Sequence, residues 1–187
     1  TDSVKIMSIH ASKGLQFPVC IIADTAALFN DADARSKTIY NSELGIGFSY
    51  YDENEKTKKT TVGREIIVDD IRRRSAEEEL RLLYVAMTRT QDKLLFTAAF
   101  NDALKSVDEI AAELSAVSGN ADEIFSKQRS YAKWLVSALL LHPDGSALRT
   151  DNCGIIPQKT NSRIKVNITE STVESGEILT EKAEFLP

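Results

Sequence analysis

The chain has 187 residues, of which 42% are hydrophobic and 27% are charged, and its formal net charge is −5. This balance is ordinary for a soluble globular protein with one core, or one core and an extension. A free-standing nucleic-acid-binding domain is more often basic, and no run of 18 apolar residues predicts a membrane span. The chain starts without methionine or a signal-peptide pattern, which indicates a piece of a longer protein.

Several kinds of site are excluded, or only weakly indicated, by residue spacing. Cys20 and Cys153 are far apart with no C-x-x-C pattern, so we expect both thiols to be reduced, in a cytosolic setting. No G-x-x-x-x-G-K-[ST] phosphate loop occurs, and the pair Gly45 and Gly47 lacks the third glycine of a dinucleotide-binding loop. With two histidines in the chain, neither a metal cluster nor a Ser–His–Asp arrangement is predicted.

The first hundred residues predict an α/β fold with a mainly parallel sheet. Residues 4–10 are rich in β-forming side chains, and 17–24 form a nearly unbroken apolar run, typical of a strand covered on both faces. The intervening "ASKGLQ" predicts a polar turn or a single helical turn. Residues 37–55 predict two short strands around "SELG", the second with one exposed face. A strand, a short crossover and a buried strand favour an α/β sheet.

A long helix is predicted from about residue 62 to 91, followed by a strand at 92–100. Four apolar residues of this helix follow the i, i+3, i+4, i+7 spacing of a packing face, namely Leu80, Leu83, Tyr84 and Met87.

Further helices are predicted in the second half of the chain. Ser106 and Glu109 resemble a capping box, and the stripe that follows comprises Val107, Ile110, Ala111 and Leu114. A helix over 130–141 has one face made of Tyr131, Trp134, Leu135 and Ala138, and "HPDG" ends it. Residues 162–171 predict a strand, and the acidic remainder resembles a linker.

Arg89 lies at the end of the long helix, where two interpretations are open. It is about 140° around the helix from Tyr84, and therefore off the predicted packing face. One interpretation is an ordinary C-terminal arginine stabilised by the helix dipole. The other is a charge clamp on a phosphoryl group, because ligands collect at sheet edges where such elements meet and guanidinium is planar and always charged.

The loop after residues 4–10 carries a second candidate group. His10, Ser12 and Lys13 can face a ligand there, and Gly14 permits close approach of a ligand to the backbone. Taken singly, His10 is an ordinary surface or half-buried histidine, and Lys13 is an ordinary solvated lysine.

Both stretches resemble motifs of a known family. "IMSIHASKGLQFPVCIIAD" resembles motif V, and "EEELRLLYVAMTRTQDKLLF" motif VI, of superfamily I DNA helicases of the UvrD/Rep type. The segments "ELGIGFSYYDENE" and "RSYAKWLVSALLLHPDG" are most similar to the AddA (RexA) family of bacterial ATP-dependent helicase–nucleases. The resemblance runs from about residue 4 to 148.

The resemblance implies roles for individual residues. Arg89 is expected to reach the γ-phosphate of ATP held between two RecA-like domains, with Thr88 setting the helix end and Tyr84 packing beneath it. Gly14 and Gln16 are expected at the nucleotide, although the family usually has an acidic residue where this chain has the neutral Gln16, which can still bond a ribose hydroxyl. The residues expected to bind single-stranded DNA are Ser8, His10, Ser12 and Lys13.

The resemblance also implies the fold and the parent protein. Residues 1–100 are expected to form the C-terminal part of a second RecA-like (P-loop NTPase type) motor domain, 101–150 a helical extension, and 151–187 a linker toward a nuclease domain. The parent is expected to be a 3′–5′ DNA helicase and exonuclease of recombinational double-strand-break repair in the bacterial cytoplasm, using ATP with Mg²⁺ bound by ligands outside this chain. Expected partners are single-stranded DNA, the other motor domains and a second helicase–nuclease subunit, with no membrane. The chain alone is expected to be inactive.

Two alternatives remain open. The parent could be a UvrD-like repair helicase without a nuclease. Otherwise the chain is a non-catalytic interaction domain, whose helices dock a partner through Trp134 and Leu139, an interpretation that the acidic charge and Gln16 favour.

Overall fold

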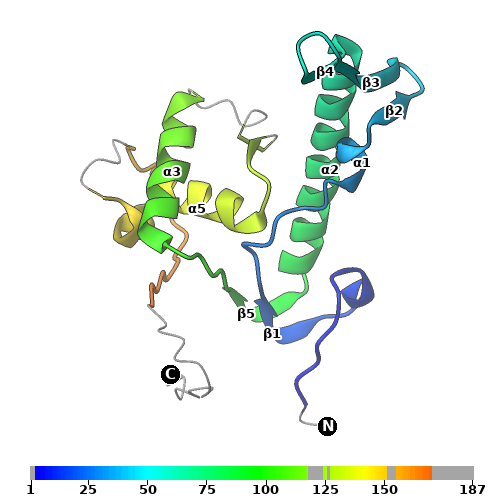
Figure 1. Cartoon of the computed structure of the whole chain (residues 1–187). Coiled ribbons are helices and arrows are strands. Elements are labelled where there is room, and N and C mark those ends of the chain that lie inside the picture. Colours follow the sequence, from blue (N-terminus) through cyan, green and yellow to red (C-terminus); the bar gives the residue numbers. More distant parts are fainter. Residues whose placement is uncertain (1–2, 118–123, 126, 151–154, 170–187) are drawn as a thin grey trace, which may run out of the picture.

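The computed structural model describes residues 3–117, 124–125, 127–150 and 155–169. Two layers of structure stand on either side of a small parallel sheet (Figure 1). The elements in chain order are η1 (His10–Ser12), β1 (Phe17–Ile22), α1 (Ala32–Arg35), β2 (Thr38–Asn41), β3 (Gly45–Asp52), β4 (Thr57–Thr60), α2 (Val62–Met87), β5 (Thr90–Phe96), α3 (Ala103–Ala116), α5 (Tyr131–Leu141) and η2 (Pro143–Leu148).

The mixed α/β class is confirmed, but the expectation of a mainly parallel sheet is wrong for the described residues. β1 and β5 pair in parallel, whereas β2, β3 and β4 form an antiparallel sheet at the far end of α2 (Figure 1). The turns 42–44 and 53–56 are too short to cross over a sheet, so the strands that they join can pair only in the antiparallel sense. The two strands predicted around "SELG" are confirmed as β2 and β3.

The parallel sheet is covered on one face only. Ile22 and Phe96 point into a cluster with Phe29, Ala76, Leu83 and Trp134. Side chains alternate along a strand, so Val19 and Ile21 point the other way, and the side chain of Ile21 is 63% exposed. The expectation that β1 is covered on both faces is therefore wrong within this chain, because α2 and α5 lie on the same side of the sheet.

The strand predicted at residues 4–10 does not form in the described part of the chain. Val4 and Ile6 are almost completely exposed, and the only regular structure in this stretch is the start of η1 at His10. A β-rich segment becomes a strand only when another strand supplies its hydrogen-bond partners. Among the described strands, β1 pairs with β5 and none runs beside residues 3–8.

The long helix α2 is confirmed, with its end earlier than predicted. It starts after Thr61, whose side chain accepts a hydrogen bond from the Arg64 backbone N–H, and it ends at Met87 rather than Gln91. The predicted packing face is mostly wrong: Leu83 is buried, but Leu80, Tyr84 and Met87 are exposed. The residues that α2 buries are Ile67, Val68, Ala76, Leu83 and Ala86.

The helical unit of α3, α5 and η2 has its own core. The predicted stripe on α3 is confirmed, since all four of its residues are buried. The capping box is wrong: α3 starts at Ala103, and Asp102 caps it by accepting from the Lys105 backbone N–H at 3.0 Å. Ser106 instead donates to the Asp102 carbonyl.

The face predicted for α5 is only partly correct. Trp134 is buried, but Ala138 is exposed. The buried set on this helix is Ala132, Trp134, Val136, Ser137 and Leu140. Two clusters contact α5, one around Trp134 and one around Leu140, so more than one face of the helix is covered.

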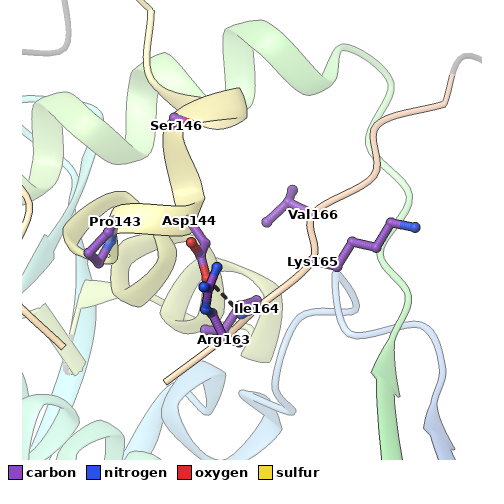
Figure 2. A pocket seen from close by; sticks show the side chains of 7 residues that line it. All are labelled: Pro143, Asp144, Ser146, Arg163, Ile164, Lys165 and Val166. Carbon is purple, nitrogen blue, oxygen red and sulfur yellow. Dashed lines mark hydrogen bonds between the residues drawn. The ribbon is translucent and has the colours of Figure 1, made fainter. Parts of the chain in front are cut away.

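Residues 155–169 cross the helical unit without forming the strand predicted at 162–171, whose last two residues lie outside the described part. The Gln158 backbone N–H donates to the Leu141 carbonyl, and the Ile164 N–H donates to an Asp144 carboxylate oxygen. Figure 2 shows this second hydrogen bond beside a shallow pocket between η2 and residues 163–166. These contacts attach the segment to the helices, which is not the behaviour expected of a linker.

Two remaining expectations concern the cysteines and the membrane. Cys20 is a free thiol and is half-buried in β1, and Cys153 lies outside the described residues. In the ranges that the structure describes, no helix combines the length and the apolar character needed to cross a membrane.

Candidate functional site

Arg89 occupies the single bend between α2 and β5. Its backbone N–H donates to the Ala86 carbonyl at 3.2 Å, which finishes the helix, and its carbonyl accepts from the Phe17 N–H at 2.9 Å, which begins the pairing with β1. The Thr88 hydroxyl donates to the Val85 carbonyl. Thr88 thus closes the last turn, and Arg89 is fixed by both neighbouring elements.

The Arg89 guanidinium is held by three hydrogen bonds. Nε donates to the Val85 carbonyl at 3.0 Å, Nη2 to the Thr88 hydroxyl at 3.1 Å, and Nη1 to the Leu15 carbonyl at 3.3 Å. A guanidinium has five N–H donors, so two remain for a ligand. The charge lies against the carboxyl end of α2, where carbonyl dipoles stabilise a cation.

The turn over residues 8–13 uses its two serines internally. The Ser8 hydroxyl accepts from the Ala11 N–H at 3.3 Å, and the Ser12 hydroxyl donates to the Ile9 carbonyl at 2.7 Å. Ser12 is buried, whereas His10 and Lys13 are exposed. The structure therefore brings these four predicted residues together, with two hydroxyls shaping the turn and two side chains facing solvent.

Gly14, Leu15 and Gln16 join this turn to Arg89. Gly14 has φ of +82°, a left-handed conformation that a side chain would strain. The Leu15 carbonyl then faces the guanidinium, and Gln16 accepts a hydrogen bond from the Gln91 side-chain amide at 3.3 Å. Gln91 was not among the predicted site residues, and no sequence signal identifies it, because its contact depends on the pairing of Phe17 with Thr90.

The edge on which these residues lie differs from the edge that binds ligands in most α/β sheets. β1 begins at Phe17 and β5 at Thr90, so Gln16 and Arg89 lie at the amino ends of the two parallel strands. Ligands of open α/β sheets bind outside the carboxyl ends. A phosphate contacted by Arg89 is then better held by another domain than by this sheet.

The Tyr84 side chain does not pack beneath Arg89, contrary to expectation. It is 69% exposed, and only its backbone carbonyl takes part in the helix end, where it accepts from the Thr88 N–H. A residue five positions before Arg89 projects from a different side of the helix, and the guanidinium turns back toward Val85 instead.

Residues 1–101 match the model of the UvrD-like helicase C-terminal domain family. The chain belongs to this family. It is 40% identical over 152 residues to the AddA-type subunit of the ATP-dependent helicase/nuclease of Clostridium botulinum (strain Alaska E43 / Type E3), an alignment that covers 79% of this chain. The same-named protein of Alkaliphilus oremlandii is 38% identical over 78% of the chain, and that of Clostridium perfringens is 39% identical over 82%.

The matched part is small in relation to these relatives. The alignments span 12% of the length of each of the three proteins. The similarity to UvrD-type helicases and to AddA, predicted from the two motifs and the segments around them, is confirmed.

Two other candidate sites in this UvrD-like domain have structural explanations. A Cβ on Gly47 would lie 2.3 Å from the Arg64 Cα, so this glycine lets β3 pack on α2, and Gly45 occupies the left-handed position of the β2–β3 turn. In the described ranges, no three His, Cys, Asp or Glu side chains are grouped closely enough to hold a metal ion.

Proposed function

We propose that this UvrD-like domain is part of the second RecA-like motor domain of an ATP-dependent 3′–5′ DNA helicase of the AddA helicase–nuclease type. The contact between the Arg89 guanidinium and the Leu15 carbonyl carries the proposal, because it joins the two helicase motifs at one point. The relatives named above support the helicase–nuclease type. Recombinational double-strand-break repair, in a bacterial cytoplasm, is the corresponding role.

Arg89 is proposed as the arginine finger. A backbone held by α2 and β5 and a guanidinium held at three points give a cation of fixed position, with two N–H donors left. ATP with Mg²⁺ would supply the phosphoryl group, and a fixed cation stabilises the charge that spreads over that group in the transition state. The location at the amino edge of the sheet favours a nucleotide carried by another domain.

The turn over residues 8–13 is proposed to contact single-stranded DNA. Exposed His10 and Lys13 are suited to the backbone, while Ser8 and Ser12 are proposed to act mainly by shaping the turn. Gly14 and Gln16 lie between this turn and Arg89, so they are proposed on the nucleotide side. The remaining motor domains and a second helicase–nuclease subunit are proposed partners.

The alternative of a docking domain loses its main support. Trp134, which was expected to present a partner surface, is buried against Phe29, Phe125 and Tyr131, with ring centroids 4.8 to 5.9 Å apart. Leu139 also packs against the core of the helical unit. Neither residue is available for the contact that this interpretation requires.

The test is a purification of the complete protein that contains this chain. We expect DNA-stimulated ATP hydrolysis, 3′–5′ unwinding and degradation of DNA ends. The isolated 187-residue chain is the matched control, and it should show no turnover and no micromolar ATP affinity in a fluorescence titration. Unwinding without degradation would favour a UvrD-like helicase that lacks a nuclease, and absence of ATP hydrolysis by the complete protein would contradict the proposal.

A further inference from the structure

A cleft of about 770 Å³ lies between α2 and the segment that leads into α5. In Figure 1 these two parts stand apart above the β1–β5 sheet. The cleft is lined by four cationic side chains, Arg72 and Arg73 on α2 and Lys127 and Arg129 opposite. It lies away from Arg89 and from the turn over residues 8–13, none of which contributes to its lining.

Arg72 and Arg129 approach each other through one shared carboxylate. Asp31 accepts from Arg129 Nη1 at 3.2 Å with one oxygen, and from Arg72 Nη2 at 3.5 Å with the other. Both contacts are long and use a single nitrogen, although a guanidinium can offer two parallel N–H groups to one anion. Within the described part of the chain, the Arg72 side chain, which is 43% exposed, pairs with Asp31 alone.

The Arg129 side chain is only 19% exposed, and its Nη2 is shielded from solvent without an acceptor among the described residues. Its backbone is fixed, because its carbonyl accepts from the Phe29 N–H at 2.8 Å. A buried donor without an acceptor is rare in folded proteins. An anion seated between the two arginines would supply the acceptor once the guanidinium turned toward it.

The other carboxylates of the cleft do not cancel this attraction equally. Asp70 is already paired with Arg73 at 2.7 Å and with Arg74 at 2.8 Å, and Asp69 also lines the cleft. Asp31 is the carboxylate placed between the two walls. Its position is therefore the one in which a phosphate, with more oxygens and more charge, would compete.

We infer that this cleft binds a phosphate group, gripped by Arg72 from α2 and by Arg129 from the opposite wall, with Asp31 as the competing internal anion. The phosphate belongs either to a polynucleotide backbone or to a free phosphate ion. The inference does not depend on the proposed motor function, because it concerns different residues and can be tested on the isolated chain.

A purely structural ion pair makes the opposite prediction for one substitution. If Asp31 only ties α2 to the segment before α5, then Asp31→Asn should lower thermal stability and leave phosphate affinity unchanged or reduced. If Asp31 occupies a phosphate site, then Asp31→Asn should strengthen phosphate binding, by about threefold or more, because a competing charge is removed.

The experiment is a calorimetric titration of the 187-residue chain at low salt with inorganic phosphate and, separately, with a short oligodeoxythymidylate. Arg72→Gln is expected to weaken binding by about tenfold, the loss of a charge-assisted contact. The matched control is Arg81→Gln, an exposed arginine on the same helix that pairs with Glu78 outside the cleft. Circular dichroism melting confirms that each variant folds, and Arg129→Gln is added if it does.

The two sources of phosphate are separated by the same variants. If Arg72→Gln weakens oligonucleotide binding, reduces its salt dependence by about one phosphate contact, and inorganic phosphate competes, the ligand is a polynucleotide backbone. If Arg72→Gln weakens inorganic phosphate binding alone, the ligand is a free phosphate. Equal effects of Arg72→Gln and Arg81→Gln, or no gain on Asp31→Asn, would overturn the inference.

Discussion

The helical unit of α3, α5 and η2 and the β1–β5 sheet beside it treat their apolar residues differently. In the helical unit Val107, Ile110 and Leu140 are buried against each other, and Leu140 has no exposed surface. In the sheet, Val19 and Ile21 face solvent on the side away from α2. Burial of apolar surface is the main source of folding free energy, so the helical unit completes its core within this chain and the sheet does not.

The two regions also differ in their polar groups. The candidate nucleotide and DNA residues all lie beside the open sheet, at the amino ends of β1 and β5, and two N–H donors of Arg89 are left for a ligand. In the helical unit, polar groups such as Ser130 and Asp102 cap helices. Residues that act on a ligand therefore gather where the chain leaves surface and donors free, and substitutions in the two regions should have separable effects.

The largest expected effect is on turnover, at Arg89. In the complete parent protein Arg89→Ala should lower kcat by about 10³-fold, as for the loss of an arginine finger. Arg89→Lys should rescue poorly, because lysine lacks the planar fork. ATP turnover and thermal melting of both variants check this, with Arg81→Ala as the control on the same helix. Near-normal turnover of Arg89→Ala would leave only a helix-end arginine, with about 0.3–1 kcal/mol of stability.

The next effect is on stability, and it compares the closed core with the open sheet face. Leu140→Ala should cost about 2–5 kcal/mol in the isolated chain, because it empties a filled site. Ile21→Ala should cost less than about 1 kcal/mol there, since most of that side chain is already in water. Urea unfolding of both variants gives the two values.

The same pair then sharpens the comparison in the complete parent. If other domains cover the open face, the cost of Ile21→Ala should rise while that of Leu140→Ala stays the same. Equal costs for the two substitutions in the isolated chain would contradict the contrast between the regions.

A smaller effect is expected at His10. In the complete parent His10→Ala should reduce DNA stimulation of the ATPase by roughly fivefold, about the loss of one hydrogen bond to the backbone, with a smaller effect on basal hydrolysis. Ser12→Ala is the matched control, because its buried hydroxyl holds the turn and its loss should disturb basal and stimulated rates together. Equal loss of both rates in His10→Ala would indicate a structural role.

The smallest effect concerns the link between the two regions. The Tyr131 hydroxyl of α5 donates to the Glu79 carboxylate of α2, and burial, followed by this hydrogen bond, raises the pKa of the phenol above its ordinary value of 10.0. The folded chain keeps this proton where the unfolded chain loses it, so stability should fall as pH rises above about 10. Tyr131→Phe should reduce that decline, as measured by urea unfolding between neutral and alkaline pH, and an unchanged decline would exclude this group as its cause.

Local patterns predicted those elements whose residues suffice to form them. The α3 stripe was correct because 3.6-residue periodicity places its four residues on one face whatever covers it, and "SELG" was correct because short turns force neighbouring strands to pair. The two motifs were visible for a similar reason: each is a continuous run of residues, such as the one from Glu77 to Phe96.

Contacts between distant residues could not be predicted in that way. The packing face of α2 was mispredicted because Leu80, Leu83, Tyr84 and Met87 have a helical period, but tertiary packing covers only Leu83. Residues 4–10 were mispredicted because strand formation needs a partner strand. The pairing of Gln91 with Gln16 follows from the register of two strands that lie far apart in the sequence.

The sequence by itself determined which segments are helical, where the hairpin turns, and which family the two motifs resemble, since each depends on neighbouring residues. Only the tertiary structure decided that Arg89 reaches the Leu15 carbonyl, that the candidate residues lie at the amino edge of the sheet, and that Asp31 stands between Arg72 and Arg129. The physical reason is that a hydrogen bond or ion pair depends on distances of a few ångströms, and those distances are set by how the helices and strands pack together.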